Sequence, residues 1–282
     1  MQNNSIKSNL TKDDIISEIR LTLGADIEKK FVYIVVEGED DIKFLRSELN
    51  DYVYLYESYD GKNGVEAIAG DTFGMNNRVI GIRDRDYSDF VNGTNAVFSY
   101  DNSCMEMMFL ADEIALQKIC CEFYLGNMSH LELRYHVLIQ LRFLSCVRKL
   151  NEKRCWNLNF KGVSIPKAYD CNTFQVFSER VKNEIKKVNQ SELDCDQCSE
   201  IDLEVQKHNM LNELLLITQG HDFTNLFATI CNNISPRSRG ISGKTVEECL
   251  RCAYSHLAFR NTKLYEVLNS HQDIIGINFL ML

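Results

Sequence analysis

Short apolar runs alternate with amphipathic segments along the first half of the chain. The apolar runs are rich in β-branched and aromatic residues, which is typical of buried strands, and the segments between them have the spacing of helices. The predicted strands cover residues 31–36, 52–57, 78–83 and 96–100, and the predicted helices cover residues 11–29, 40–49 and 103–123. This alternation predicts an α/β fold: a mostly parallel sheet with right-handed crossovers, flanked by helices.

The second half has a different pattern, dominated by helical periodicity. A long helix is expected at residues 130–150, followed by a short strand pair around 156–160 and 162–165. Further helices are expected at residues 173–189, 199–219, 222–232 and 244–268. We therefore expect an α/β catalytic domain at residues 1–126 and a mainly helical domain at residues 127–282.

Composition narrows the class of protein. Hydrophobic residues make up 45% of the 282 residues and charged residues 25%, as in ordinary globular proteins. There is no long apolar run and no apolar signal-peptide core, so we expect a soluble, cytoplasmic protein without a membrane segment. The 11 cysteines include two CxxC pairs, at 195–198 and 249–252. A zinc site would need both pairs together, and we interpret the cysteines instead as reduced thiols.

Two acidic clusters directly follow predicted strands. Glu37 ends the first strand, with acids at 39–41 behind it, and Asp84 and Asp86 follow the third strand. Acids at a helix start or in a turn are often structural, and Asp40 could simply cap the next helix. Carboxylates at the carboxyl edge of a sheet would instead repel one another unless a cation lay between them. In extended backbone Asp84 and Asp86 would point the same way, which favours a Mg²⁺ site for phosphodiester chemistry.

These residues resemble the Toprim signature, an acidic Glu-Gly-x-x-Asp after one strand and Asp-x-Asp after the third. The version at residues 37–41 is most similar to the overcoming-lysogenization-defect (OLD) type of Toprim. Residues 100–108 and 219–223 resemble two further elements of a stand-alone Toprim family. Such proteins occur beside AAA ATPases in bacterial antiphage defence, including the phage-anti-restriction-induced system (PARIS). The resemblance covers residues 31–110 and, more loosely, 215–270.

The resemblance implies roles for individual residues. Glu37 would be the first metal ligand and would serve in acid/base chemistry, and Asp84 and Asp86 would be metal ligands. Asp41 and Glu106 would support a second ion, with Mg²⁺ or Mn²⁺ as the metal.

The Gly-His-Asp element in the helical half has two interpretations. His221 and Asp222 could act at the site, as a proton shuttle or a substrate contact, or Asp222 could cap a helix. Residues 240–245 lack the spacing of a phosphate-binding loop, and we expect Ser242 to cap a helix there. An ATPase of the AAA or ABC type must then be a separate chain.

The expected function is a toxic Mg²⁺-dependent endonuclease of antiphage defence, active as a homodimer, with tRNA as the substrate that the resemblance implies. A DNA-nicking nuclease and a catalytically silent binding or sensor subunit are the alternatives. The net charge of −9 favours the silent subunit, whereas the complete acidic set favours the enzyme. Basic residues do gather locally, at Arg142, Arg148, Lys149, Lys153, Arg154, Lys161 and Lys167, and again at Arg237, Arg239 and Lys244.

Overall fold

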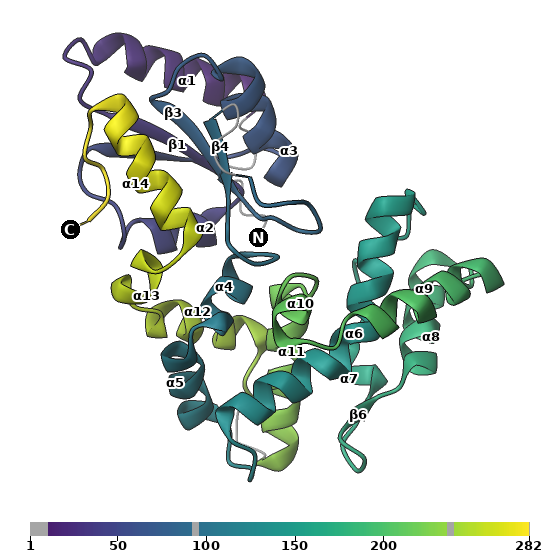
Figure 1. Cartoon of the computed structure of the whole chain (residues 1–282). Coiled ribbons are helices and arrows are strands. Elements are labelled where there is room, and N and C mark those ends of the chain that lie inside the picture. Colours follow the sequence, from purple (N-terminus) through teal and green to yellow (C-terminus); the bar gives the residue numbers. More distant parts are fainter. Residues whose placement is uncertain (1–10, 92–95, 236–239, 282) are drawn as a thin grey trace, which may run out of the picture. The chain divides into compact units, whose positions relative to one another are not determined.

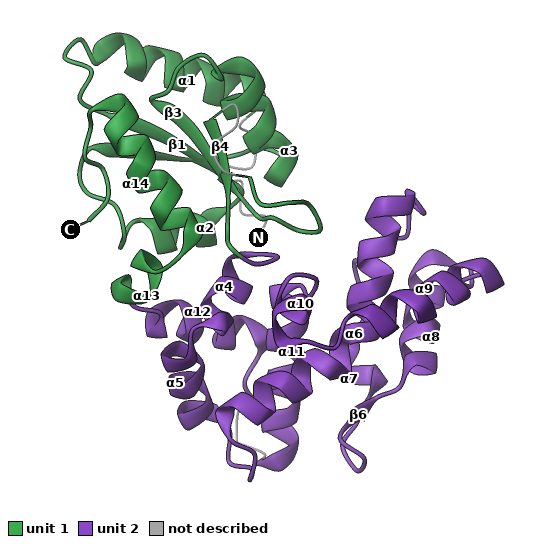
Figure 2. Cartoon of the chain, viewed as in Figure 1, with its two compact units in different colours: residues 1–101, 256–282 green, residues 102–255 purple. Residues whose placement is uncertain are grey.

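A computed structural model describes residues 11–91, 96–235 and 240–281 of the chain. The chain forms two compact units: unit 1 comprises residues 1–101 and 256–282, and unit 2 comprises residues 102–255 (Figures 1 and 2). The α/β prediction is confirmed, because unit 1 holds a parallel sheet and helices dominate the second half of the chain. Arg237 and Arg239 lie outside the described residues.

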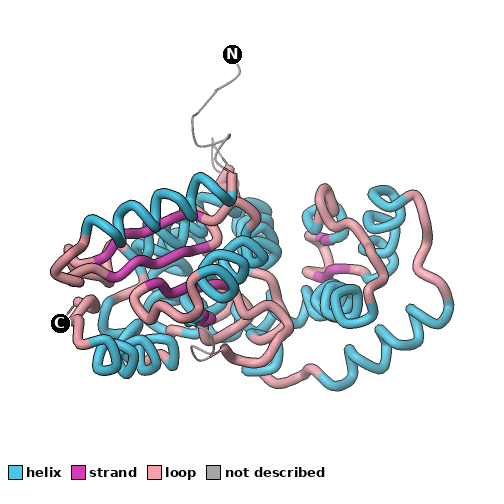
Figure 3. Tube along the Cα trace, turned by 90° about the horizontal axis from the view of Figure 1, so that it is seen from above, coloured by secondary structure: helices cyan, strands magenta, loops and turns pink. Residues whose placement is uncertain are grey.

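Unit 1 is built on a four-stranded sheet with the order β2-β1-β3-β4, in which every pair of neighbours is parallel. The strands are β1 Val32–Val36, β2 Val53–Glu57, β3 Val79–Arg83 and β4 Val97–Ser99. All five residues of β1 and of β3 are buried, as expected for central strands covered on both faces. Helices lie above and below these strands (Figure 3). Because β1 and β3 are parallel neighbours, their carboxyl ends lie at the same edge of the sheet.

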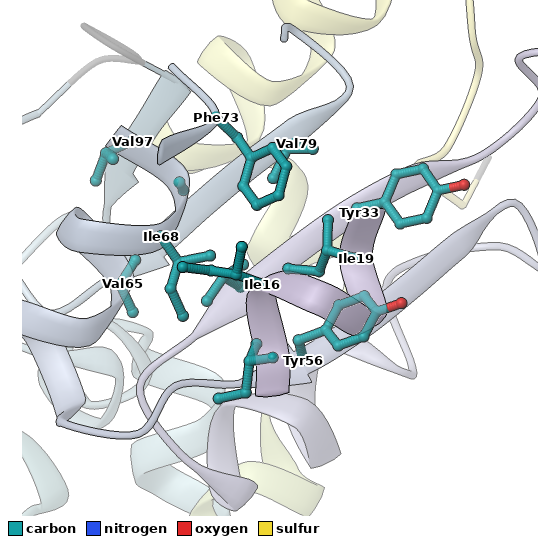
Figure 4. Packing of buried hydrophobic residues seen from close by; sticks show 12 residues of the cluster. Ile16, Ile19, Tyr33, Tyr56, Val65, Ile68, Phe73, Val79 and Val97 are labelled. Carbon is teal, nitrogen blue, oxygen red and sulfur yellow. The ribbon is translucent and has the colours of Figure 1, made fainter. Parts of the chain in front are cut away.

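One face of the sheet is covered by α1 (Lys12–Ala25), α3 (Gly61–Val65) and the π-helix η2 (Glu66–Thr72). Ile16 and Ile19 of α1 pack on Tyr33 and on neighbouring apolar residues (Figure 4). Gly81 permits this packing, because a Cβ atom there would lie 2.6 Å from a methyl group of Val65. The absence of a side chain on β3 thus lets α3 approach the sheet closely.

The other side of unit 1 is formed by α2 (Glu39–Leu45), α13 (His256–Arg260) and α14 (Lys263–Ile275). The rings of Phe44 and Phe259 meet edge to face at 5.3 Å. The chain end returns to the same unit through a bridge between Leu49 and Leu280. The last helices therefore belong with the sheet, which differs from the expected division into residues 1–126 and 127–282.

Unit 2 is mainly helical. Its longest helix, α6 (His130–Arg154), has 25 residues; Ser129 caps its start and Cys155, in a left-handed conformation, ends it. The other elements are α4 Met105–Ala111, α5 Glu113–Phe123, α7 Ile165–Ala168, β5 Tyr169–Asp170, β6 Gln175–Val176, α8 Ser178–Asn189, α9 Cys195–Lys207, α10 Leu211–Leu215, α11 Gly220–Ile234 and α12 Gly243–Ala253. None of the helices formed by the described residues combines the length and the apolar character needed to span a bilayer.

Several predicted elements are wrong in detail. The helix expected at 103–123 is two helices, because the Asp112 carboxylate accepts a hydrogen bond from the Ala115 N–H (2.7 Å) and starts a new one. The segment 244–268 is split among α12, α13 and α14. No strand pair forms at 156–165; Gly162 turns there with φ +99°, and the short antiparallel pair is β5–β6 instead.

Candidate active site

Two predicted acidic residues meet at the carboxyl edge of the sheet. Val36 of β1 pairs with Ile82 of β3, so the residues that follow these strands lie next to each other. The backbone N–H of Asp84 donates a hydrogen bond to Oε1 of Glu37 at 2.6 Å. The chain segments that follow β1 and β3 thus meet at this edge, and the contact is made by the backbone N–H of Asp84.

Glu37 is partly buried and electrostatically strained. Burial, together with the negative charges of Asp41 and Asp86, raises its pKa, which lies at about 7 on balance. The hydrogen bond from the Asp84 N–H and the positive charge of Lys62 lower the pKa of Glu37, but they do not cancel the increase. Glu37 therefore exchanges its proton near neutral pH, unlike an exposed glutamate.

Asp41 is tied into the local structure by both of its carboxylate oxygens. Oδ2 accepts a hydrogen bond from the Gly38 N–H (3.0 Å), and Oδ1 accepts one from the hydroxyl of Tyr100 (2.7 Å). Asp41, rather than Asp40, thus forms the polar link at the start of α2. Asp40 instead pairs with the exposed Lys43, which makes Lys43 part of an ordinary solvated helix face.

Asp86 does not share the extended geometry that the sequence suggested. Strand β3 ends at Arg83, and the chain turns so that Asp86 has a left-handed φ of 50°. The extended backbone on which the prediction for Asp84 and Asp86 was based therefore does not continue through Asp86, because the strand has already ended. Asp86 Oδ2 instead lies 2.7 Å from Nζ of Lys62.

Lys62 is the site residue that sequence reasoning missed. It lies in the first turn of α3, directly after Gly61, whose φ of 48° turns the chain past Glu37. Its ammonium group neutralises part of the carboxylate charge beside Glu37 and Asp86. A polar Lys after a strand and a Gly gives no distinctive signal, because only the β2–α3 connection brings it to this edge of the sheet.

The donor types at this edge suit a hard divalent cation, which prefers carboxylate oxygens. Glu37, Asp84 and Asp86 are the residues that would hold it. As they stand, however, no three His, Cys, Asp or Glu side chains in residues 11–91, 96–235 and 240–281 are gathered closely enough to hold a metal ion. Binding a cation at this edge would therefore require these side chains to turn toward one another.

The other two predicted site residues, Glu106 and His221, belong to unit 2. Glu106 lies in the first turn of α4, where it packs against Gly220; a Cβ atom on Gly220 would lie 2.5 Å from Oε2 of Glu106. The motifs at residues 100–108 and 219–223 thus contact each other at the start of α11.

The Gly-His-Asp element is not a helix cap. Helix α11 already begins at Gly220, and the buried Asp222 forms an ion pair with Arg148, with 2.9 Å between Oδ2 and Nε. The His221 side chain is 57% exposed and its Nε2 lies 3.5 Å from Oδ1 of Asp222. Ser242, in contrast, does cap α12 by accepting a hydrogen bond from the Thr245 N–H, as predicted.

All 11 cysteines are free thiols.

No protein-family model matches the chain, and no curated protein matches its sequence.

Proposed function

We propose that the chain is a divalent-metal-dependent nuclease of the Toprim type that hydrolyses phosphodiesters. The proposal is carried by one observation: Glu37 and Asp84 meet at the carboxyl ends of adjacent parallel strands, and Glu37 has a pKa near 7. This edge is where open α/β folds bind their ligands. A carboxyl group with its pKa near the working pH is suited to exchange a proton during catalysis.

In this proposal the residues at this edge have different roles. Glu37 accepts or holds a proton at its carboxylate, and Asp84 and Asp86 supply oxygen ligands for a cation. Mg²⁺ or Mn²⁺, when bound, would supply positive charge for the phosphate oxygens. Tyr100 and the Gly38 N–H fix Asp41, which keeps a negative charge beside Glu37. Lys62 adds a positive charge that can stabilise a phosphate oxygen.

The biological role that we propose follows from the resemblance of the motifs. The chain would be a toxic effector of antiphage defence that cleaves tRNA, restrained by a separate AAA or ABC-type ATPase and active as a homodimer. A DNA-nicking activity at the same site is the nearest alternative.

A silent binding subunit is the second candidate, and the charge of unit 1 favours it. Unit 1 contains 13 Lys and Arg against 21 Asp and Glu, a net charge of −8, whereas unit 2 has 18 against 19. A surface with this charge repels nucleic acid at long range and attracts a basic protein.

The deciding experiment incubates the purified chain with total cellular RNA and with plasmid DNA, in Mg²⁺ or in EDTA. Glu37→Gln removes the charge and keeps the size of the side chain, and the exposed Glu39→Gln is the matched control. We expect discrete tRNA fragments in Mg²⁺ that EDTA abolishes, a loss of at least about 10²-fold in Glu37→Gln, and no loss in Glu39→Gln.

Each other outcome selects an alternative. Nicked plasmid with intact RNA selects the DNA nuclease. Cleavage that survives Glu37→Gln rejects this site as the catalytic centre. Intact substrates, repeated in the presence of the partner ATPase and combined with no Mg²⁺ binding by calorimetry, select the silent subunit.

A further inference from the structure

Unit 2 contains a cleft of about 420 Å³, far from the acidic residues in sequence. It is lined by α6, by residues 160–166, which form a loop and the start of α7, and by the first two turns of α11. We call it the basic cleft and define it by its polar lining residues Arg148, Lys161, Ser164, His221, Asp222 and Asn225, of which Asp222 is the acid that pairs with Arg148. Its size is in the range of ligand-binding clefts in proteins.

Arg148 is held rigidly in the wall of this cleft. Its guanidinium group lies 4.5 Å from the centre of the Phe160 ring, and it forms a two-point ion pair with the buried Asp222. Nη2 donates a hydrogen bond to Oδ1 of Asp222, whereas Nε lies 2.9 Å from Oδ2 without hydrogen-bond geometry. A guanidinium group has five N–H donors in all. Asp222 thus orients Arg148 while Nη1 remains as a donor, since no hydrogen bond among the described residues uses that atom.

Lys161 adds a positive charge that is not compensated locally. Its side chain is exposed, and none of the ion pairs found in the described part of the chain involves it. His221 is more than half exposed, and Ser164 does not use its hydroxyl to cap α7. These groups supply several N–H and O–H donors to one concave surface.

The surrounding sequence strengthens the positive character of the cleft. Residues 134–187, which run from α6 to α8, contain 12 Lys and Arg but only four Asp and Glu. Acids of α9 neutralise part of this charge, for example through Lys149–Glu204 and Arg154–Glu200. The loop 160–166 has no such partner among the ion pairs of the described residues.

We propose that the basic cleft binds a phosphate group of an RNA strand, with Lys161 and Arg148 as the charged contacts and Asp222 as the residue that positions Arg148. Charge-assisted bonds from a fixed guanidinium group and an ammonium group are the usual means of holding a phosphate. The choice of RNA rests on the proposed function, whereas the phosphate chemistry rests on the cleft alone.

The test measures binding and not cleavage, using the full chain with Glu37→Gln in EDTA. Fluorescently labelled tRNA is titrated at several salt concentrations, followed by anisotropy. Lys161→Ala is compared with Lys153→Ala, which removes another exposed lysine that does not line the cleft. We expect Lys161→Ala to weaken binding about fivefold and to reduce the salt slope by about 0.7, because one phosphate contact is lost. Lys153→Ala should change neither quantity.

Equal effects of the two substitutions, or no effect of Lys161→Ala, would overturn the proposal. A parallel arm adds inorganic phosphate and a 5′-mononucleotide and follows thermal unfolding. If these stabilise the parent chain but not Lys161→Ala, while tRNA binding stays unchanged, the cleft holds a small anion and the RNA assignment is wrong. Specific binding through Lys161 would leave the cleft inference intact even where the cleavage and Mg²⁺-binding experiments select the silent subunit over the nuclease.

Discussion

A partly buried glutamate in unit 1 and a buried glutamate in unit 2 have opposite electrostatic environments. Glu37 in unit 1 is surrounded by other acids, and burial together with Asp41 and Asp86 raises its pKa to about 7. Glu204 in unit 2 is also penalised by burial, but hydrogen bonds from Lys149, Lys207 and His208 outweigh this and lower its pKa to about 2. The same residue type is thus destabilised as an anion in one unit and stabilised as an anion in the other.

The difference separates paired charge from charges that repel one another. In unit 2 the buried carboxylates of Glu204 and Asp222 are paired with Lys149 and Arg148, which is what stability requires. In unit 1 the chain tolerates repulsion at the edge of the sheet, where a folded protein gains nothing from it. Uncompensated charge kept in this way is typical of active sites.

The largest expected effect tests the paired side of the comparison. Asp222→Ala leaves Arg148 as a largely buried, uncompensated charge, and we expect a loss of about 3–5 kcal/mol in the free energy of unfolding. Urea unfolding measures it. The double variant Asp222→Ala, Arg148→Met should recover most of the loss, because it removes both charges. Glu200→Ala, which breaks the exposed pair with Arg154, is the control and should cost less than about 1 kcal/mol.

The second prediction tests the repulsion between Glu37 and the neighbouring carboxylates in unit 1. Because the folded-state pKa of Glu37 lies above its ordinary value of 4.5, the folded state binds the proton more tightly, and stability is lost as pH rises toward 7. Glu37→Gln mimics the protonated form and should therefore stabilise the protein. We expect a gain below about 1 kcal/mol at pH 5 that grows to about 3 kcal/mol at pH 8, measured by urea unfolding. A destabilised Glu37→Gln at pH 8 would contradict the electrostatic strain.

The third prediction is the opposite case in unit 2. The pKa of Glu204 is lowered below 4.5, so its contribution to stability is present above pH 4.5 and is lost as pH falls toward 2. Glu204→Gln should therefore cost about 2 kcal/mol at pH 7, since partial solvent contact screens the ion pairs. The cost should shrink as pH falls below 4.5. Stabilisation by Glu204→Gln at pH 7 would remove the contrast between the two glutamates.

Much of this arrangement could be predicted from the sequence, because strands and their ends leave local signals. The apolar runs predicted all four strands of the sheet, and the acids after two of them identified the contact between Glu37 and Asp84. Boundaries in the helical half were less predictable, since a single cap such as Asp112 divides a continuous helical pattern.

The rest depends on tertiary contacts that have no local signature. The left-handed turn at Asp86 follows from the early end of β3, and the proximity of Lys62 follows from the β2–α3 connection. The pairing of Arg148 with Asp222 joins residues 74 positions apart. The sequence suggested either that His221 and Asp222 act at the site or that Asp222 caps a helix. It gave no sign that Asp222 orients an arginine.

The smallest expected effect concerns Lys62, which forms an ion pair among the mutually repelling carboxylates of unit 1. Lys62→Met removes the ammonium group beside Asp86 and leaves the carboxylates of unit 1 with less compensation. Because both side chains of the pair are partly exposed, we expect a loss of only about 1 kcal/mol at pH 8. Mg²⁺ should raise the melting temperature of Lys62→Met more than that of the wild type, since a cation would then relieve a larger repulsion. Lys43→Met, which alters an exposed pair on α2, should show neither effect. If Mg²⁺ raised the melting temperatures of the two variants equally, the carboxylates beside Lys62 would not be the ones that bind the cation.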